Sequence, residues 1–153
     1  MELKKILWPT DLSENAAKAQ PYVTSLTEKY QTEVHVLYVM EDVPYAEARY
    51  HGPVPDFDPS DLDKVREWEE EQAKERLDGI CKEHLKGCPM YVRHVAVGDP
   101  AKEILNFIER EKADMVVMAS RGRKGFFYGS VAEKVVKNST VPVVMIPVSP
   151  EGE

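Results

Sequence analysis

The stretch MVVMASRGRKGFFYGSV, residues 115–131, leads from a short apolar run through a glycine-containing loop into a helical pattern. The run Met115–Ala119 is continuous rather than alternating, which is typical of a parallel strand covered on both faces. The helical pattern opens at Ser130. A strand, a glycine loop and a helix N-terminus bring free backbone N–H groups together. This stretch therefore predicts an α/β fold with an anion site after the strand.

Four other apolar runs alternate with helical patterns along the chain. The runs predict strands at Ile6–Trp8, Val34–Val39, Met90–Val97 and Val141–Pro147. The helical patterns begin near Ser13, near Pro59, at Asp99–Pro100 and at Ser130. Pro21 lies within the first of them and is expected to bend that helix or delay its start. Such alternation predicts a parallel sheet with right-handed crossovers.

We predict a single α/β domain over residues 1–153. It is an open five-stranded parallel sheet with helices on both faces, Rossmann-like, with strand order 3-2-1-4-5. Residues 41–58, rich in proline, tyrosine and acidic residues, are predicted to be an irregular insertion loop. In this order strands 1 and 4 are neighbours, so Pro9-Thr10-Asp11 lies beside the glycine loop. Ligands of such sheets bind at the carboxyl ends of the strands, where the strand order reverses.

The composition limits the classes of partner. The 153 residues carry a net charge of -7, which argues against nucleic-acid backbones and anionic membrane surfaces. The two cysteines and four histidines have no spacing typical of a redox pair or a metal site, so we expect reduced, partly buried thiols and histidines with structural or solvent roles. The polar face of the second long helix is expected to be solvated. No signal peptide or membrane span is visible, so we expect a cytoplasmic protein.

Two residues near the predicted site have alternative interpretations. Ser130 and Glu133 match a helix capping box, but the same serine hydroxyl and amide suit a phosphate oxygen. Asp11 suits a ribose hydroxyl or a metal ion, or a turn after the strand. The sequence has no P-loop motif, no dinucleotide-binding glycine motif after strand 1 and no hydrolase nucleophile elbow.

Five segments together resemble the universal stress protein family. They are Lys4–Ser13, Val97–Ile104, Ala113–Met118, Gly129–Val135 and Pro142–Pro147. The resemblance implies a five-stranded parallel sheet and a homodimer that pairs through the last strand, residues 141–147. Such pairing would cover an exposed apolar edge.

One branch of that family binds ATP through a loop with glycine, two residues, glycine, nine residues, then glycine and serine or threonine. This chain departs from the pattern twice. Ala119 stands at the first glycine position, and six residues rather than nine separate Gly122 from Gly129. The shorter loop has a smaller reach over bound phosphates.

The resemblance implies binding of ATP or another adenine nucleotide, with Mg²⁺ held through the phosphates. Carried over by position, the site consists of Pro9, Thr10, Asp11, Val39, Met118, Ala119, Ser120, Gly122, Arg123, Gly129, Ser130 and Val131. Asp11 is expected on the ribose, Val39 beside the adenine and Ser130 at the phosphates. We expect regulatory binding without a catalytic residue, and at most very slow hydrolysis.

Two alternatives remain from other functional classes. The first is a nucleotide-free dimeric interaction module, in which the dimer surface and residues 41–58 contact a protein partner. The second is an enzyme that cleaves ATP between the α and β phosphates. Such enzymes generally have a serine- and glycine-rich loop after strand 1, whereas this chain has PTDLS at residues 9–13.

Overall fold

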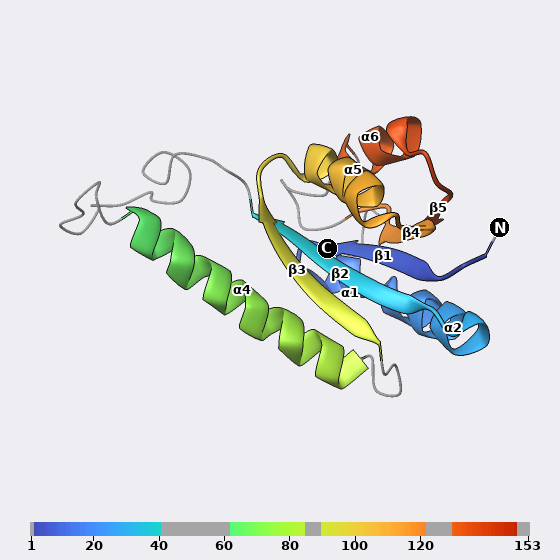
Figure 1. Ribbon diagram of the computed structural model, residues 1–153, viewed down its shortest axis with the longest axis horizontal. Coiled ribbons are helices and arrows are strands. Elements are labelled where there is room, and N and C mark those ends of the chain that lie inside the picture. Colours follow the sequence, from blue (N-terminus) through green and yellow to red (C-terminus); the bar gives the residue numbers. More distant parts are fainter. Residues whose placement is uncertain (1, 41–61, 85–89, 122–129, 150–153) are drawn as a thin grey trace.

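A computed structural model describes residues 2–40, 62–84, 90–121 and 130–149 of the chain. Its five strands form one parallel sheet in the order β3-β2-β1-β4-β5 (Figure 1). The strands are β1 (Lys5–Thr10), β2 (Glu33–Met40), β3 (Tyr91–Val97), β4 (Met115–Ala119) and β5 (Val143–Ile146). The predicted fold class and strand order are therefore confirmed.

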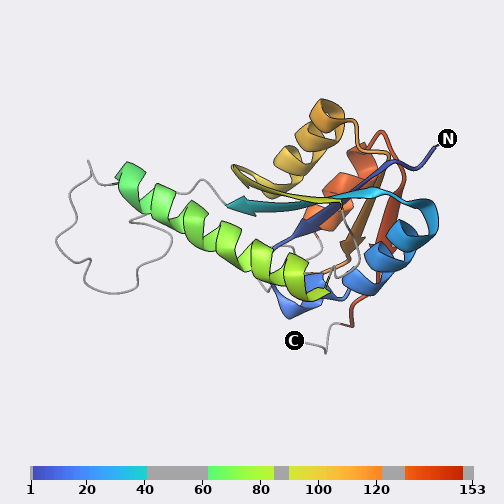
Figure 2. The same cartoon turned by 60° about the horizontal axis from the view of Figure 1, so that its bottom comes forward.

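Helices cover both faces of this sheet (Figures 1 and 2). One face carries α1 (Glu14–Ala17), α2 (Gln20–Tyr30) and α4 (Leu62–His84). The other carries α5 (Pro100–Glu111) and α6 (Ser130–Asn138). The predicted irregular loop at residues 41–58 lies outside the described residues. Within the described part of the chain, no helix is both long and apolar enough to cross a bilayer.

Alternate residues of each strand point to opposite faces, which gives the protein two apolar cores. Ile6 and Trp8 of β1 pack with Val34 and Val36 of β2 on the face of α2 and α4. Their neighbour Leu7 packs on the other face. The members of that second cluster from the strands and from α5 include Leu37, Val39, Ile104, Phe107, Val116 and Met118.

The first helical pattern forms two helices, and the longer one starts late, next to Pro21, which is one of the two predicted effects of this proline. The helix α1 ends at Ala17, and α2 begins at Gln20 with the proline in its first turn, where a missing N–H costs no helical hydrogen bond. Ser13 caps α1 because its Oγ accepts a hydrogen bond from the Ala16 N–H at 3.1 Å. The turn between β1 and α1 is thereby held in place close to the end of the strand.

Two histidines join β2 to β3, in agreement with the structural role expected for them. His35 Nδ1 lies 2.8 Å from His94 Nε2, and the two rings are stacked. His35 Nε2 contacts the Glu33 carboxylate at 2.6 Å, while Phe107 of α5 presents its ring against His94. Burial lowers the pKa of His94 below its ordinary value of 6.5, and the neighbouring His35 lowers it further. Glu111 and Glu33 oppose this shift, and Arg110 adds to it.

The lowered pKa of His94 predicts a loss of stability on acidification. The unfolded chain binds a proton more readily than the folded one, so His94 favours folding fully above pH 6.5 and less as the pH falls below it. We expect the urea midpoint to fall between pH 7.5 and about 5.5. His94→Gln removes the ionisable ring and is expected to flatten this dependence. Equal slopes for the variant and the unmodified protein would contradict the prediction.

Candidate functional site

The sheet reverses its strand order between β1 and β4. From β1 the chain crosses to β2 by way of α1 and α2 on one face, and from β4 it crosses to β5 by way of α6 on the other. Connections that leave neighbouring strands on opposite faces do not cover the carboxyl ends of those strands. This edge is the position at which open parallel sheets bind ligands.

The pairing of β1 with its two neighbours is unequal. Its register with β2 continues from Lys5 to Thr10, whereas its register with β4 covers Ile6 and Leu7. Pro9 lies in the part of β1 that is paired with β2 alone, and it has no backbone N–H to donate. The central strands therefore cease to pair with each other before they reach the carboxyl edge of the sheet.

Thr10 and Asp11 lie at the end of β1 and shape the turn that follows. Thr10 Oγ1 accepts a hydrogen bond from the Leu12 N–H at 3.0 Å, and Asp11 Oδ1 accepts one from the Ser13 N–H at 2.9 Å. Both residues are buried, at 2% and 5% exposure respectively. The turn role that we considered for Asp11 is thus confirmed, and its second role on a ribose stays a prediction.

The end of β4 holds the next group of predicted site residues. Met118 and Ala119 are buried in register with Met145 and Ile146 of β5. Ser120 joins the ends of these two strands, because its N–H donates to the Ile146 carbonyl at 2.8 Å and its Oγ accepts from the Val148 N–H at 3.0 Å. The serine hydroxyl is therefore already part of the strand pairing.

Ala119 lies in a strand with an ordinary negative φ. Only a left-handed φ would make glycine preferable to alanine here. The first departure from the ATP-binding loop pattern is therefore compatible with the local backbone. The second departure, the shorter loop, lies outside the described residues, as do Gly122, Arg123 and Gly129.

The structure brings three of the predicted site residues into one apolar cluster. Val39, Met118 and Val131 pack together with Leu7 and Ala132 on the face covered by α5 and α6. Ser130 is exposed as the first residue of α6. The polar ends of β1 and β4 thus lie at the edge of the sheet, above a shared apolar floor.

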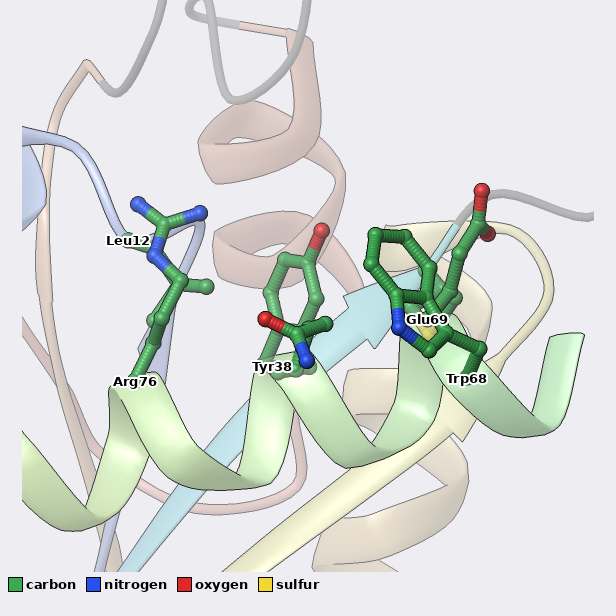
Figure 3. Close-up of a pocket in the computed structure, with 8 residues that line it drawn as sticks. Leu12, Tyr38, Trp68, Glu69 and Arg76 are labelled. Carbon is green, nitrogen blue, oxygen red and sulfur yellow. The ribbon is translucent and has the colours of Figure 1, made fainter. Parts of the chain in front are cut away.

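A second feature of the same edge was missed in the sequence. A cavity of about 340 Å³ lies between α4 and the carboxyl end of β2 (Figure 3). We call it the α4–β2 cavity. It is lined by Leu12, Tyr38, Met40, Trp68, Glu69, Gln72, Ala73 and Arg76. The prediction of a solvated helix face agrees with the exposure of the α4 side chains, but the spacing of Trp68, Gln72 and Arg76 by four residues could have indicated one common surface.

Among the described residues, no group of three or more histidine, cysteine, aspartate or glutamate side chains is placed to hold a metal ion. His35 and His94 are hydrogen-bonded to each other, and Cys81 is buried in the core. The side chains of the other two histidines and of Cys88 lie outside the described part of the structure.

Comparison with known proteins identifies the family. The family model described as "Universal stress protein family" matches residues 2–147. The chain belongs to the universal stress protein family. It is 30% identical over 146 residues to universal stress protein MJ0531 of Methanocaldococcus jannaschii, covering 94% of this chain and 81% of that protein. It is 31% identical to universal stress protein MJ0577 of the same organism, covering 94% of each.

Solved structures of universal stress proteins share the fold. The structure of MJ0577 superposes with a TM-score of 0.72 at 29% identity and covers 99% of this chain and 100% of that one. A universal stress protein from Archaeoglobus fulgidus, solved in complex with dAMP, superposes with a TM-score of 0.62 at 20% identity. The comparison covers 95% of this chain and 99% of that structure.

Restoring the glycine of the family pattern is expected to weaken the fold. Ala119→Gly adds backbone freedom to the unfolded chain and removes a buried methyl group, so the free energy of unfolding should fall by about 1 kcal/mol. Gly79→Ala is the matched opposite change, because space is open around this glycine of α4. It should raise the free energy of unfolding by up to about 1 kcal/mol. Urea unfolding measures both, and a more stable Ala119→Gly variant would contradict the assigned backbone.

Proposed function

We propose that this universal stress protein binds ATP or another adenine nucleotide at the edge where β1 and β4 cease to pair. The observation that carries the proposal is the short register between these strands, which ends at Leu7 while β1 continues to Thr10. A ligand at this edge meets polar groups from both strands. The universal stress protein from Archaeoglobus fulgidus, which shares this fold, was solved in complex with dAMP, and this supports an adenine nucleotide as the ligand class.

Each part of the nucleotide has proposed contacts. Val39, Met118 and Val131 supply an apolar floor for the base and sugar, because all three are buried in one cluster. Asp11 accepts a hydrogen bond from the ribose, beside the turn bond that it already makes to Ser13. At the phosphates, Ser130 and the first amides of α6 supply N–H donors at the positive end of the helix dipole.

The remaining proposed contacts come from Pro9, Thr10, Ala119 and Ser120 of the strand ends, and from Gly122, Arg123 and Gly129. Mg²⁺, where present, is held through the phosphate oxygens. The described carboxylate of this site fits a ribose better than a metal, since Asp11 Oδ1 already accepts a hydrogen bond from the protein. Arg123 adds positive charge to a protein that is acidic overall.

We propose that the protein is a single domain located in the cytoplasm. Its role would be regulatory and would depend on nucleotide binding. Among the described site residues, Asp11 is the only carboxylate, and it is buried in a turn. A base that activates water must lie within hydrogen-bond reach of that water and be free to accept its proton. The proposal therefore includes slow hydrolysis at most.

Asp11→Asn tests the nucleotide site. The amide oxygen still accepts the Ser13 N–H, so the turn is retained, but the charge-assisted bond to a ribose hydroxyl is lost. We expect micromolar ATP binding by titration calorimetry and about tenfold weaker binding by the variant. Asp78→Asn on α4 is the matched control and should bind as the unmodified protein does. No ATP binding and no nucleotide released on denaturation would favour the nucleotide-free interaction module.

We also propose a homodimer that pairs through residues 141–147. The strand β5 is the edge of the sheet, and its Val143, Val144 and Met145 are only partly buried. An apolar hollow of about 360 Å³ adjoins it, with Ala132, Val136 and Met145 in its lining. An exposed apolar edge strand that remains unpaired favours aggregation, so a partner copy is a natural cover.

The dimer proposal predicts that a charge placed at one edge of the sheet disrupts the dimer, whereas a charge at the other edge does not. Val136→Lys places a charge beside β5, where Val136 is 51% exposed, and should convert the dimer to a monomer in sedimentation measurements. Val92→Lys is the matched control, because Val92 is 40% exposed on β3 at the opposite edge. A dimer that survives the first change or is lost with the second would contradict the proposed pairing.

A further inference from the structure

We propose that the α4–β2 cavity is a second binding site, for a planar aromatic small molecule with a single negative charge at one end and a hydrogen-bond donor at the other. The cavity volume of about 340 Å³ is at the lower end of the range for small-molecule sites, roughly 300–1,000 Å³. A ligand with one ring is therefore of suitable size. This inference is independent of the proposed nucleotide site.

The lining residues come from three elements and converge on one space. Trp68, Gln72 and Arg76 follow one another at intervals of four on α4, so they lie on one face of the helix. Tyr38 comes from β2, and its ring lies between Arg76 and Trp68 in Figure 3. Leu12 closes the end near Arg76 from the turn after β1.

Aromatic and apolar groups account for the ring preference. Trp68 is 63% exposed, whereas Trp8, the other tryptophan, is buried. With Tyr38, Trp68 offers aromatic surfaces to a flat ligand, which would remove apolar area from water and add ring contacts. Met40 and Ala73 are buried at the base of the cavity and contribute no polar side-chain atom.

The two ends of the α4–β2 cavity carry opposite charges, and this is why the proposed ligand has a negative group at one end and a hydrogen-bond donor at the other. Arg76 and Glu69 are seven residues apart on α4, which corresponds to about 10 Å along the helix axis. Neither side chain forms an ion pair or a hydrogen bond with another described residue, whereas the side chains of Lys74 and Asp78 on the same helix are in ion pairs. The Arg76 guanidinium suits a carboxylate because it can donate two parallel hydrogen bonds. Glu69 suits a donor such as an amine or a hydroxyl.

The surrounding charge favours one negative group over several. Glu70, Glu71 and Glu75 accompany Glu69 on α4, so a ligand with multiple phosphates would meet repulsion that a single carboxylate largely avoids. The sheet also separates this cavity from the proposed nucleotide floor. Tyr38 packs with the core on the α4 face, while its neighbour Val39 packs on the face of α5 and α6.

The test uses 4-aminobenzoate, which combines a flat ring, one carboxylate and a donor at the far end. The protein has two tryptophans, so an NMR spectrum of ¹⁵N-labelled full chain gives two indole N–H signals, which Trp68→Phe assigns. We expect a saturable shift of the Trp68 signal with little change at the buried Trp8. Methyl 4-aminobenzoate lacks the charge and benzoate lacks the donor, so both are expected to bind more weakly.

Three variants distinguish a specific site from non-specific contact between the ligand and the Trp68 ring. Arg76→Gln should weaken 4-aminobenzoate binding about tenfold, because the charge-assisted bonds are lost. Arg66→Gln, on the same helix and outside the cavity lining, is the matched control and should leave binding unchanged. Glu69→Gln should remove the preference for 4-aminobenzoate over benzoate. Equal effects of the two arginine changes, equal shifts of both indoles, or no saturable shift at millimolar concentrations would overturn the proposal.

Discussion

The end of β1–β4 pairing at Leu7 is the constraint on which the rest of this structure depends. A parallel strand in the centre of a sheet is normally paired along its length on both sides, and β1 is paired to its end only with β2. The chain leaves β1 and β4 toward opposite faces, so within the described residues no helix closes the edge between them. Polar groups can occur there without interrupting the core. This explains why Thr10 and Asp11 are buried yet hydrogen-bonded to their own turn.

The two faces of the sheet have different chemistry as a consequence of the same topology. The α5 and α6 face is closed by an apolar cluster that includes Leu7 and Val135, and the His35–His94 pair packs against Phe107 on this face. The other face is covered by α4, whose charged surface approaches the end of β2 and leaves the α4–β2 cavity (Figure 3). The two proposed ligands, which differ in polarity, would therefore bind at two positions along one edge, with the sheet between them.

Much of the candidate site could be predicted because it depends on local order along the chain. Thr10 and Asp11 follow an apolar run, and parallel strands place such ends on one edge whatever the side chains are. The role of Ser120 could not be predicted, because its hydroxyl accepts from Val148, which is distant in sequence and is brought near by β4–β5 pairing. The contact between His35 and His94 could not be predicted from the sequence either, since it depends on the register of β2 with β3.

The sequence by itself determined the alternation of strands and helices, the late helix start near Pro21, the helix starts at Asp99–Pro100 and Ser130, and the family. These follow from periodicity, from proline geometry and from motifs that are contiguous in the chain. Only the tertiary structure decided where β1 and β4 stop pairing, which way Tyr38 and Val39 face, and that Trp68 and Arg76 meet β2 across a cavity. Strand register and helix placement are set by how complete side chains fill the space between layers, and no local pattern encodes that fit.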